Sequence, residues 1–159
     1  MASRARERNF EMAALEPPRL GKPTTMPLRV ELKPFERIII GESVIINSGV
    51  RTSFLIDGDT PILRERDTVS AETADTPAKR LYHCVQTMYL KNDVPRYQAS
   101  YLGILQELQD SLQDSLQDSC PGSSDLIAAV SRHVSDGALY KALKEIRKLM
   151  KREEERTAA

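Results

Sequence analysis

The stretch MPLRVELKPFERIIIGESVIINSG, residues 26–49, contains an alternating segment followed by two β-branched runs. In LRVEL, residues 28–32, leucine and valine alternate with arginine and glutamate, which is typical of a half-buried strand. The runs RIII and SVIIN are separated by Gly41 and Glu42, a pair that suits a two-residue hairpin with glycine at positive φ. The stretch therefore predicts short antiparallel strands.

Further strands are expected directly after this stretch. NSG at residues 47–49 marks a turn, TSFLI at 52–56 reads as a strand, and PILRER at 61–66 reads as a last short strand. Asp57 and Gly58 between them favour a second two-residue hairpin. No connection is long enough for a parallel crossover, so we predict an antiparallel meander of four to five short strands, a small roll or half-barrel.

A helical period replaces the strand period from residue 75 onward. Thr76 suits an N-cap, Pro77 suits the first helical position, and Asn92 lies where the first helix should end. A long second helix is expected from Pro95, followed by a short helix over residues 123–134 and a last helix after Gly137. The predicted fold class is α+β, with the β-meander followed by a C-terminal helical region of three to four helices.

The composition divides the chain into three parts. Residues 1–25 combine charged residues with three prolines and show no sustained period, so we expect a disordered N-terminal extension. Residues 26–70 are expected to form a β-rich domain, and residues 71–159 a helical region.

Charge is unevenly spread, although the whole chain has a net charge of zero. Residues 93–136 hold two basic and seven acidic side chains and include LQDS three times at 108–119, whereas residues 137–159 hold seven basic and four acidic ones. Both segments carry an apolar stripe at helical spacing. We predict that the acidic helix is the intramolecular partner of the basic last helix; pairing of the leucine stripe with another chain is the alternative.

Several classes of protein are disfavoured by the residues present. No apolar run approaches the roughly 18 residues of a membrane span, and no secretory signal is recognisable. The two cysteines and two histidines lack the spacing of a metal site, and Cys84 is expected to pack in a core. No nucleophile motif, phosphate loop or acid–base pair is recognisable. We predict a cytoplasmic protein that is not an enzyme and uses no metal or cofactor.

Five basic residues of the predicted strands are candidates for RNA binding. Arginines on a small sheet can hold phosphates, and an exposed aromatic side chain such as Phe35 can stack on an unpaired base. The alternative is a solvated face with local ion pairs, because acidic residues are interleaved. The candidates are Lys33, Arg37, Arg51, Arg64 and Arg66.

Three ordered blocks carry a resemblance to a known family: the opening stretch, TSFLIDGDTPILRE, and ADTPAKRLYHCVQTMYL. Together they resemble the FlbT family of flagellin-synthesis regulators from alphaproteobacteria. The resemblance implies a post-transcriptional regulator that associates with the 5′ untranslated leader of flagellin mRNA and affects its translation and stability, in most members as a repressor. It also implies opposition by a companion protein, FlaF, and brings no catalytic residue and no map of RNA contacts.

Two hypotheses follow. The first is a repressor that binds the flagellin mRNA leader through its basic strand residues. The second is a protein-interaction module that binds a flagellar protein partner and affects the mRNA indirectly. Neither involves a membrane, and whether the chain forms a homodimer is left open.

Overall fold

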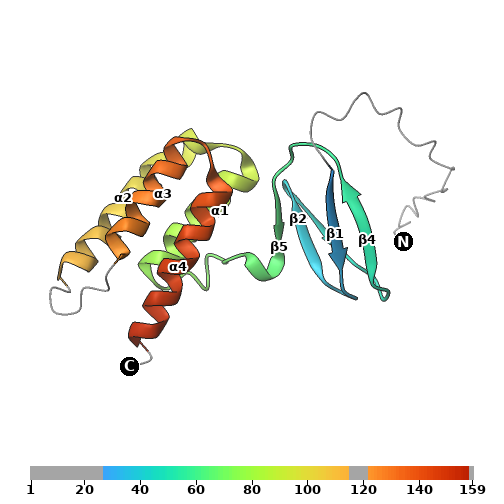
Figure 1. The fold of residues 1–159 in the computed structure, drawn as a ribbon, viewed down its shortest axis with the longest axis horizontal. Coiled ribbons are helices and arrows are strands. Elements are labelled where there is room, and N and C mark those ends of the chain that lie inside the picture. The colour runs from blue at the N-terminus through green and yellow to red at the C-terminus, as the bar shows by residue number, and fades with distance from the viewer. Residues whose placement is uncertain (1–26, 115–121, 158–159) are drawn as a thin grey trace, which may run out of the picture.

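The computed structural model describes residues 27–114 and 122–157, which form strands first and helices afterwards (Figure 1). The predicted α+β class is confirmed. The expected disordered extension at residues 1–25, and the LQDS repeat beyond Asp114, lie outside the described residues. The strands are β1 (Leu28–Leu32), β2 (Arg37–Ile40), β3 (Ser43–Ile46), β4 (Thr52–Ile56) and β5 (Ile62–Arg64), and a 3-10 turn, η1 (Glu65–Asp67), follows them.

The strands form two small antiparallel sheets. The predicted hairpin is confirmed, because Ile40 pairs with Ser43 across Gly41, whose φ is +60°. The order of the larger sheet is β3-β2-β5, and the smaller sheet is β1-β4. The expected hairpin at Asp57 and Gly58 is therefore wrong, and the strands do not form one continuous meander: residues 57–61 connect the two sheets instead.

A small shared core explains this pairing. Val30 and Leu32 of β1 and Ile38 of β2 are buried together, and Phe54, Ile56 and Ile62 pack against them. Pairing β4 with β1 places the apolar side chains of both strands on one side, where they close over β2 and β5. A β4–β5 hairpin would separate those side chains and expose them to water, which costs free energy in proportion to the apolar area.

Four helices follow the strands in the part of the chain that the structure describes. They are α1 (Pro77–Lys91), α2 (Val94–Asp114), α3 (Ser123–Ser135) and α4 (Leu139–Thr157). The caps of α1 are as predicted: the Thr76 side chain accepts a hydrogen bond from the Lys79 N–H, and Asn92 ends the helix in the left-handed region at φ 51°. Short caps of this kind satisfy backbone groups that the helix ends leave unpaired.

The core of the helical part surrounds α1. Leu81, Val85 and Met88 are fully buried, and Cys84, a free thiol, packs with them as predicted. α4 packs chiefly on α1 and α3, whereas α2 packs chiefly on α1. The prediction that α2 is the main partner of α4 is therefore wrong. α1 buries residues around more of its circumference than α4 does, so α1 takes the central position, and α2 meets α4 at a small pocket.

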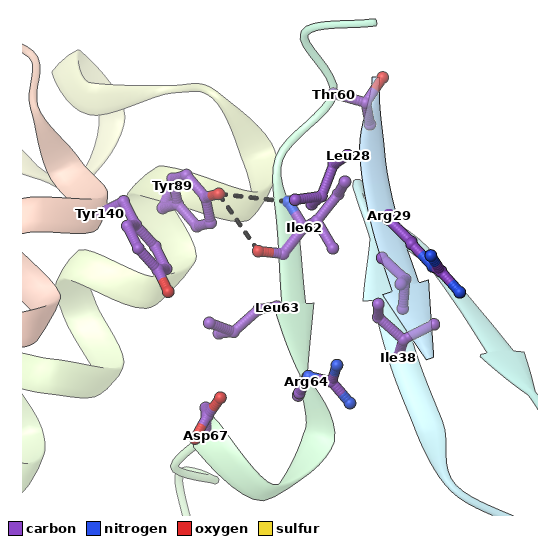
Figure 2. Close-up of a pocket in the computed structure, with 11 residues that line it drawn as sticks. Leu28, Arg29, Ile38, Thr60, Ile62, Leu63, Arg64, Asp67, Tyr89 and Tyr140 are labelled. Atoms are coloured by element: carbon purple, nitrogen blue, oxygen red, sulfur yellow. Dashed lines mark hydrogen bonds between the residues drawn. The ribbon is translucent and has the colours of Figure 1, made fainter. Parts of the chain in front are cut away.

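Two tyrosines of α1 connect the helices to the strands. The Tyr82 hydroxyl donates to the Asp67 carbonyl and accepts from Arg147 Nη2 of α4 at 3.0 Å. Burial raises the pKa of Tyr82 above its ordinary value, so the ring stays neutral. The Tyr89 hydroxyl donates to the Ile62 carbonyl and accepts from the Ile62 N–H, both at 3.2 Å (Figure 2). These contacts leave β1 and β4 at the end of the molecule away from the helices (Figure 1).

Candidate nucleic-acid interface

The smaller sheet has one buried face and one exposed face. Val30 and Leu32 point into the core, so the residues between them point to solvent. Register then places β4 residues beside them: Leu55 pairs with position 29, and Ser53 with position 31. We call the exposed side the outer face. It consists of Arg29, Glu31, Ser53 and Leu55 of the two strands, together with Lys33 and Arg51, which the alternation adds directly after β1 and before β4; all six are exposed.

The outer face is basic, with three cationic side chains and one carboxylate. Glu31 lies between Arg29 and Arg51, at N–O distances of 3.7 and 3.4 Å. Among the described residues, Lys33 has no carboxylate partner for its ammonium group. The ion pairs of Glu31 with the two arginines are well exposed to water, and such surface ion pairs contribute only about 0–1 kcal/mol each to stability. A phosphate could therefore replace Glu31 as a partner at little cost.

Phe35 lies beside the outer face in the turn between β1 and β2. The Glu36 N–H donates to the Lys33 carbonyl at 3.1 Å and closes the turn after Pro34. Phe35 has φ +63° and is 73% exposed, so its ring lies in water, as the sequence indicated. A bulky residue in the left-handed region costs about 1–2 kcal/mol relative to the right-handed one. Folding thus tolerates strain that holds an aromatic ring outward.

Asn47 holds this turn in place. Its side chain is buried, and its amide nitrogen donates to the carbonyls of Leu32, Lys33 and Val50 at 3.1, 2.8 and 2.8 Å. Its carbonyl oxygen accepts from the Thr52 hydroxyl at 3.1 Å. One side chain therefore fixes the end of β1, the turn and the start of β4. The position of Phe35 follows from this network.

The five predicted residues do not form one patch. Lys33 and Arg51 lie on the outer face, but the other three lie on or next to the larger sheet. Arg37 faces Glu65 at 3.6 Å. Arg64 has a structural role, because it bonds the Glu36 carboxylate at 3.0 Å and a backbone carbonyl of β1 at 3.1 Å. The alternative of local ion pairs describes Arg37 and Arg64, whereas Arg66, in η1, is exposed.

Arg29 also lies on the outer face and was not among the five candidates, although the sequence carried a signal for its position. The alternation in LRVEL places Arg29 on the same side as Lys33. What the sequence did not reveal is that β4 pairs with β1, which brings Arg51 to the same face. Without that pairing, Arg29 appears as an isolated surface charge.

A pH-dependent contribution to stability is expected from Glu36. The Lys33 backbone N–H, which donates at 2.8 Å, and the Arg64 guanidinium hold the pKa of Glu36 below its ordinary value. A carboxylate whose pKa is lowered by folding stabilises the protein at pH values above its unfolded-state pKa, about 4.3. That stabilisation is lost as the pH falls through the folded-state pKa. Glu36→Gln should therefore lower the urea midpoint at neutral pH and have little effect in strong acid. An equal loss at both pH values would contradict this account.

A second basic surface lies on α4. Lys144 lies over the exposed ring of Tyr140, with the ammonium nitrogen 4.9 Å from the ring centroid, and Lys148 pairs with Glu145 at 3.2 Å. Lys141 and Lys151 continue the same helix face. The opposite side of α4 is the apolar stripe that packs in the core. This surface holds cations but does not include an aromatic ring free of intramolecular contact.

Residues 27–114 and 122–157 contain neither a metal-ligand cluster nor a membrane-spanning helix. No three His, Cys, Asp or Glu side chains in these ranges come close enough to share a metal ion. None of the helices in these ranges is both long and apolar enough to span a bilayer.

Comparison with known proteins identifies the family. The profile of the family described as "Flagellar protein FlbT" matches residues 28–157, which include every strand and helix of the described structure. The chain belongs to the FlbT family. This confirms the resemblance carried by the three sequence blocks.

Curated relatives in the FlbT family cover most of the chain. A "Probable flagellum biosynthesis repressor protein FlbT" of Rhodopseudomonas palustris is 60% identical over 130 residues, 82% of this chain and 97% of that protein. A relative named likewise, FlbT 1 of Bradyrhizobium diazoefficiens, is 44% identical over 130 residues, 81% of this chain and 84% of its own. The "Flagellum biosynthesis repressor protein FlbT" of Caulobacter vibrioides is 31% identical over 132 residues, which cover 82% of this chain and 89% of that protein. No solved structure matches the chain.

Proposed function

We propose that this FlbT-family chain represses flagellum biosynthesis by binding the 5′ untranslated leader of flagellin mRNA. Relatives named as repressors of flagellum biosynthesis support the repressor role. The binding would occur in the cytoplasm, where the messenger is translated, and would act by occlusion of the leader or by a change in its decay. The chain would make and break no covalent bond.

The observation that carries the proposal is Phe35. Phe35 is 73% exposed and has positive φ, so its ring contributes little to the packing of the described fold. It follows Lys33 by two residues in the same turn, and the Lys33 ammonium has no carboxylate partner among the described residues. Single-stranded RNA offers what this pair lacks, namely a base to stack on the ring and a phosphate for the cation. The outer face extends the site along β1 and β4.

Phe35→Gly separates RNA binding from stability. Glycine adopts positive φ without steric cost, so the free energy of unfolding should stay the same or rise by up to about 1 kcal/mol. Loss of the ring should weaken leader binding by about 1–3 kcal/mol, the usual contribution of stacking on one aromatic side chain. Leader affinity measured by filter binding, with urea unfolding in parallel, tests both parts.

Leu102→Ala, at an exposed apolar position on α2, is the control for this experiment. It should change neither leader affinity nor the specificity for the leader over an unrelated RNA. If Phe35→Gly bound the leader as tightly as the unaltered chain, the ring would not be part of the site.

The role of the outer face can be tested by salt dependence. Each phosphate contact to a single strand adds about −0.7 to the slope of log affinity against log salt. Arg51→Gln should therefore reduce the steepness of that slope by about 0.7. Arg37→Gln is a matched control, since it is also an exposed arginine with one glutamate partner, but on the other sheet. Equal slopes for both variants would remove the outer face as the contact surface.

The alternative function is a protein-interaction module that binds a flagellar partner, such as the companion protein FlaF, and affects the mRNA indirectly. Two exposed apolar residues favour it, Leu55 on the outer face and Val50 in the segment before β4. Purified protein that fails to bind the flagellin leader at low salt, but binds it when a flagellar protein is added, would support this alternative and exclude the first.

A further inference from the structure

The larger sheet has one open edge, along β3. The Asn47 N–H donates to the Glu36 carbonyl at 3.0 Å, so the N–H of residue 47 points toward β2. Because N–H groups point alternately to the two sides of a strand, those of Val44 and Ile46 point away from β2. β2 is the only strand beside β3 among the described residues. The backbone groups of Val44 and Ile46 therefore lie unpaired at the edge.

The opposite edge of the same sheet, along β5, lies against the helices. The Tyr89 hydroxyl bonds both the N–H and the carbonyl of Ile62 on the outer side of β5 (Figure 2). Leu63 of β5 points toward the helices and is buried. Its cross-strand neighbour Ile39 on β2 is only partly buried, and Val44 on β3, next in the same row, is 55% exposed. Cover by the rest of the chain thus declines from β5 to β3.

β3 also lacks the features that usually protect an edge strand. Natural edge strands carry lysine, proline or a bulge that discourages pairing with another chain. β3 reads Ser-Val-Ile-Ile, with no charge, no proline and regular pairing to β2. Ile45 and Ile46 are 42% and 57% exposed. Both faces of the strand therefore present apolar side chains to water beside unpaired backbone groups.

We propose that β3 pairs with β3 of a second copy of this chain, antiparallel about a two-fold axis that passes midway between the two Ile45 residues. A two-fold axis perpendicular to the sheet leaves the two faces of the sheet in place. Residues that lie opposite each other must therefore point to the same face, so their numbers are both even or both odd. With Ile45 opposite Ile45 of the partner, Val44 lies opposite Ile46. Val44 of each chain then exchanges two backbone hydrogen bonds with Ile46 of the other chain, which gives four bonds in all.

A second copy fits this edge better than an unrelated partner for two reasons. The register that pairs the outward backbone groups also matches apolar side chains on both faces, without any change of sequence. The strand offers no charge that would select a partner of opposite charge. The result would be one six-stranded sheet in the order β5-β2-β3-β3-β2-β5, three strands from each chain. Four residues a side form a small contact, so we expect a dimer that dissociates on dilution.

Sedimentation equilibrium of the full chain over a range of concentrations is the first test. The unaltered chain should show a monomer–dimer equilibrium. Ile45→Lys should raise the dissociation constant by about tenfold or more, because it places two like charges directly opposite each other. Leu55→Lys, the same change at an exposed apolar position of β4, should not. A monomer at every concentration, or equal dissociation constants in the two variants, would overturn the proposal.

Disulfide trapping provides a test that does not depend on how well a lysine variant folds. Opposed Cβ atoms in such a pair lie about 4.5–5.5 Å apart, so Ile45→Cys should cross-link across the axis under mild oxidation. The chain would carry Cys120→Ser, and Cys84 is buried. Leu55→Cys is the matched control. Strong cross-linking of the Ile45 variant alone supports the register; cross-linking no stronger than in the control overturns it.

Discussion

Leu143→Ala is expected to lower the free energy of unfolding by about 2–5 kcal/mol. Leu143 is fully buried on α4, the helix that packs on both α1 and α3. Removing its branched end takes away buried apolar surface and leaves a cavity in the core of the helical part. Because α4 also reaches η1 through Arg147, a loosened α4 should weaken the link to the strands as well.

Urea unfolding followed by circular dichroism measures this loss. Leu102→Ala, on the exposed side of α2, is the control and should lie within about 0.5 kcal/mol of the unaltered chain. If the two variants had equal midpoints, the packing of α4 against α1 and α3 would be wrong.

Asn47→Ala is expected to lower the free energy of unfolding by about 2–3 kcal/mol. The buried amide is the donor for three backbone carbonyls, and an unsatisfied buried group costs about 1–3 kcal/mol. Water can reach part of the turn and compensates for some of the loss. Under the proposed function, the same variant should also weaken leader binding, because Phe35 would no longer be held beside Lys33.

Asn47→Asp sharpens this test. A carboxylate keeps the acceptor for Thr52 but replaces the donor with an oxygen that faces three carbonyls. It should be at least as destabilising as alanine near neutral pH. Ser48→Ala, at the exposed neighbouring position, should have an effect within about 0.5 kcal/mol. If Asn47→Asp left the urea midpoint unchanged, the hydrogen bonds donated by the Asn47 amide would not stabilise the fold.

The candidate RNA site shows how far local pattern carries. The outward position of Lys33 and the exposure of Phe35 could be predicted, because both depend on a strand that ends in a Pro-containing turn. The local pattern could not show that Arg64 has a structural role. Its guanidinium donates to the Glu36 carboxylate and to a carbonyl of β1, and those partners are 28 and 33 residues away in the sequence. Whether an arginine is free for a ligand depends on neighbours that only folding brings to it.

The sequence by itself determined most of the elements and several of their ends, although the strand expected over residues 61–66 ends at Arg64 and η1 follows it. Alternation fixed the buried side of β1, Gly41 fixed the hairpin, and Thr76 and Asn92 fixed the limits of α1, since these features depend on residues a few positions apart. Tertiary structure decided which strands pair and which helix lies at the centre. Several pairings of short apolar strands satisfy the same local pattern, and the one adopted is the one that closes a shared core over Val30 and Ile38. For the same reason, the outer face and the open edge of β3 exist only in the folded chain.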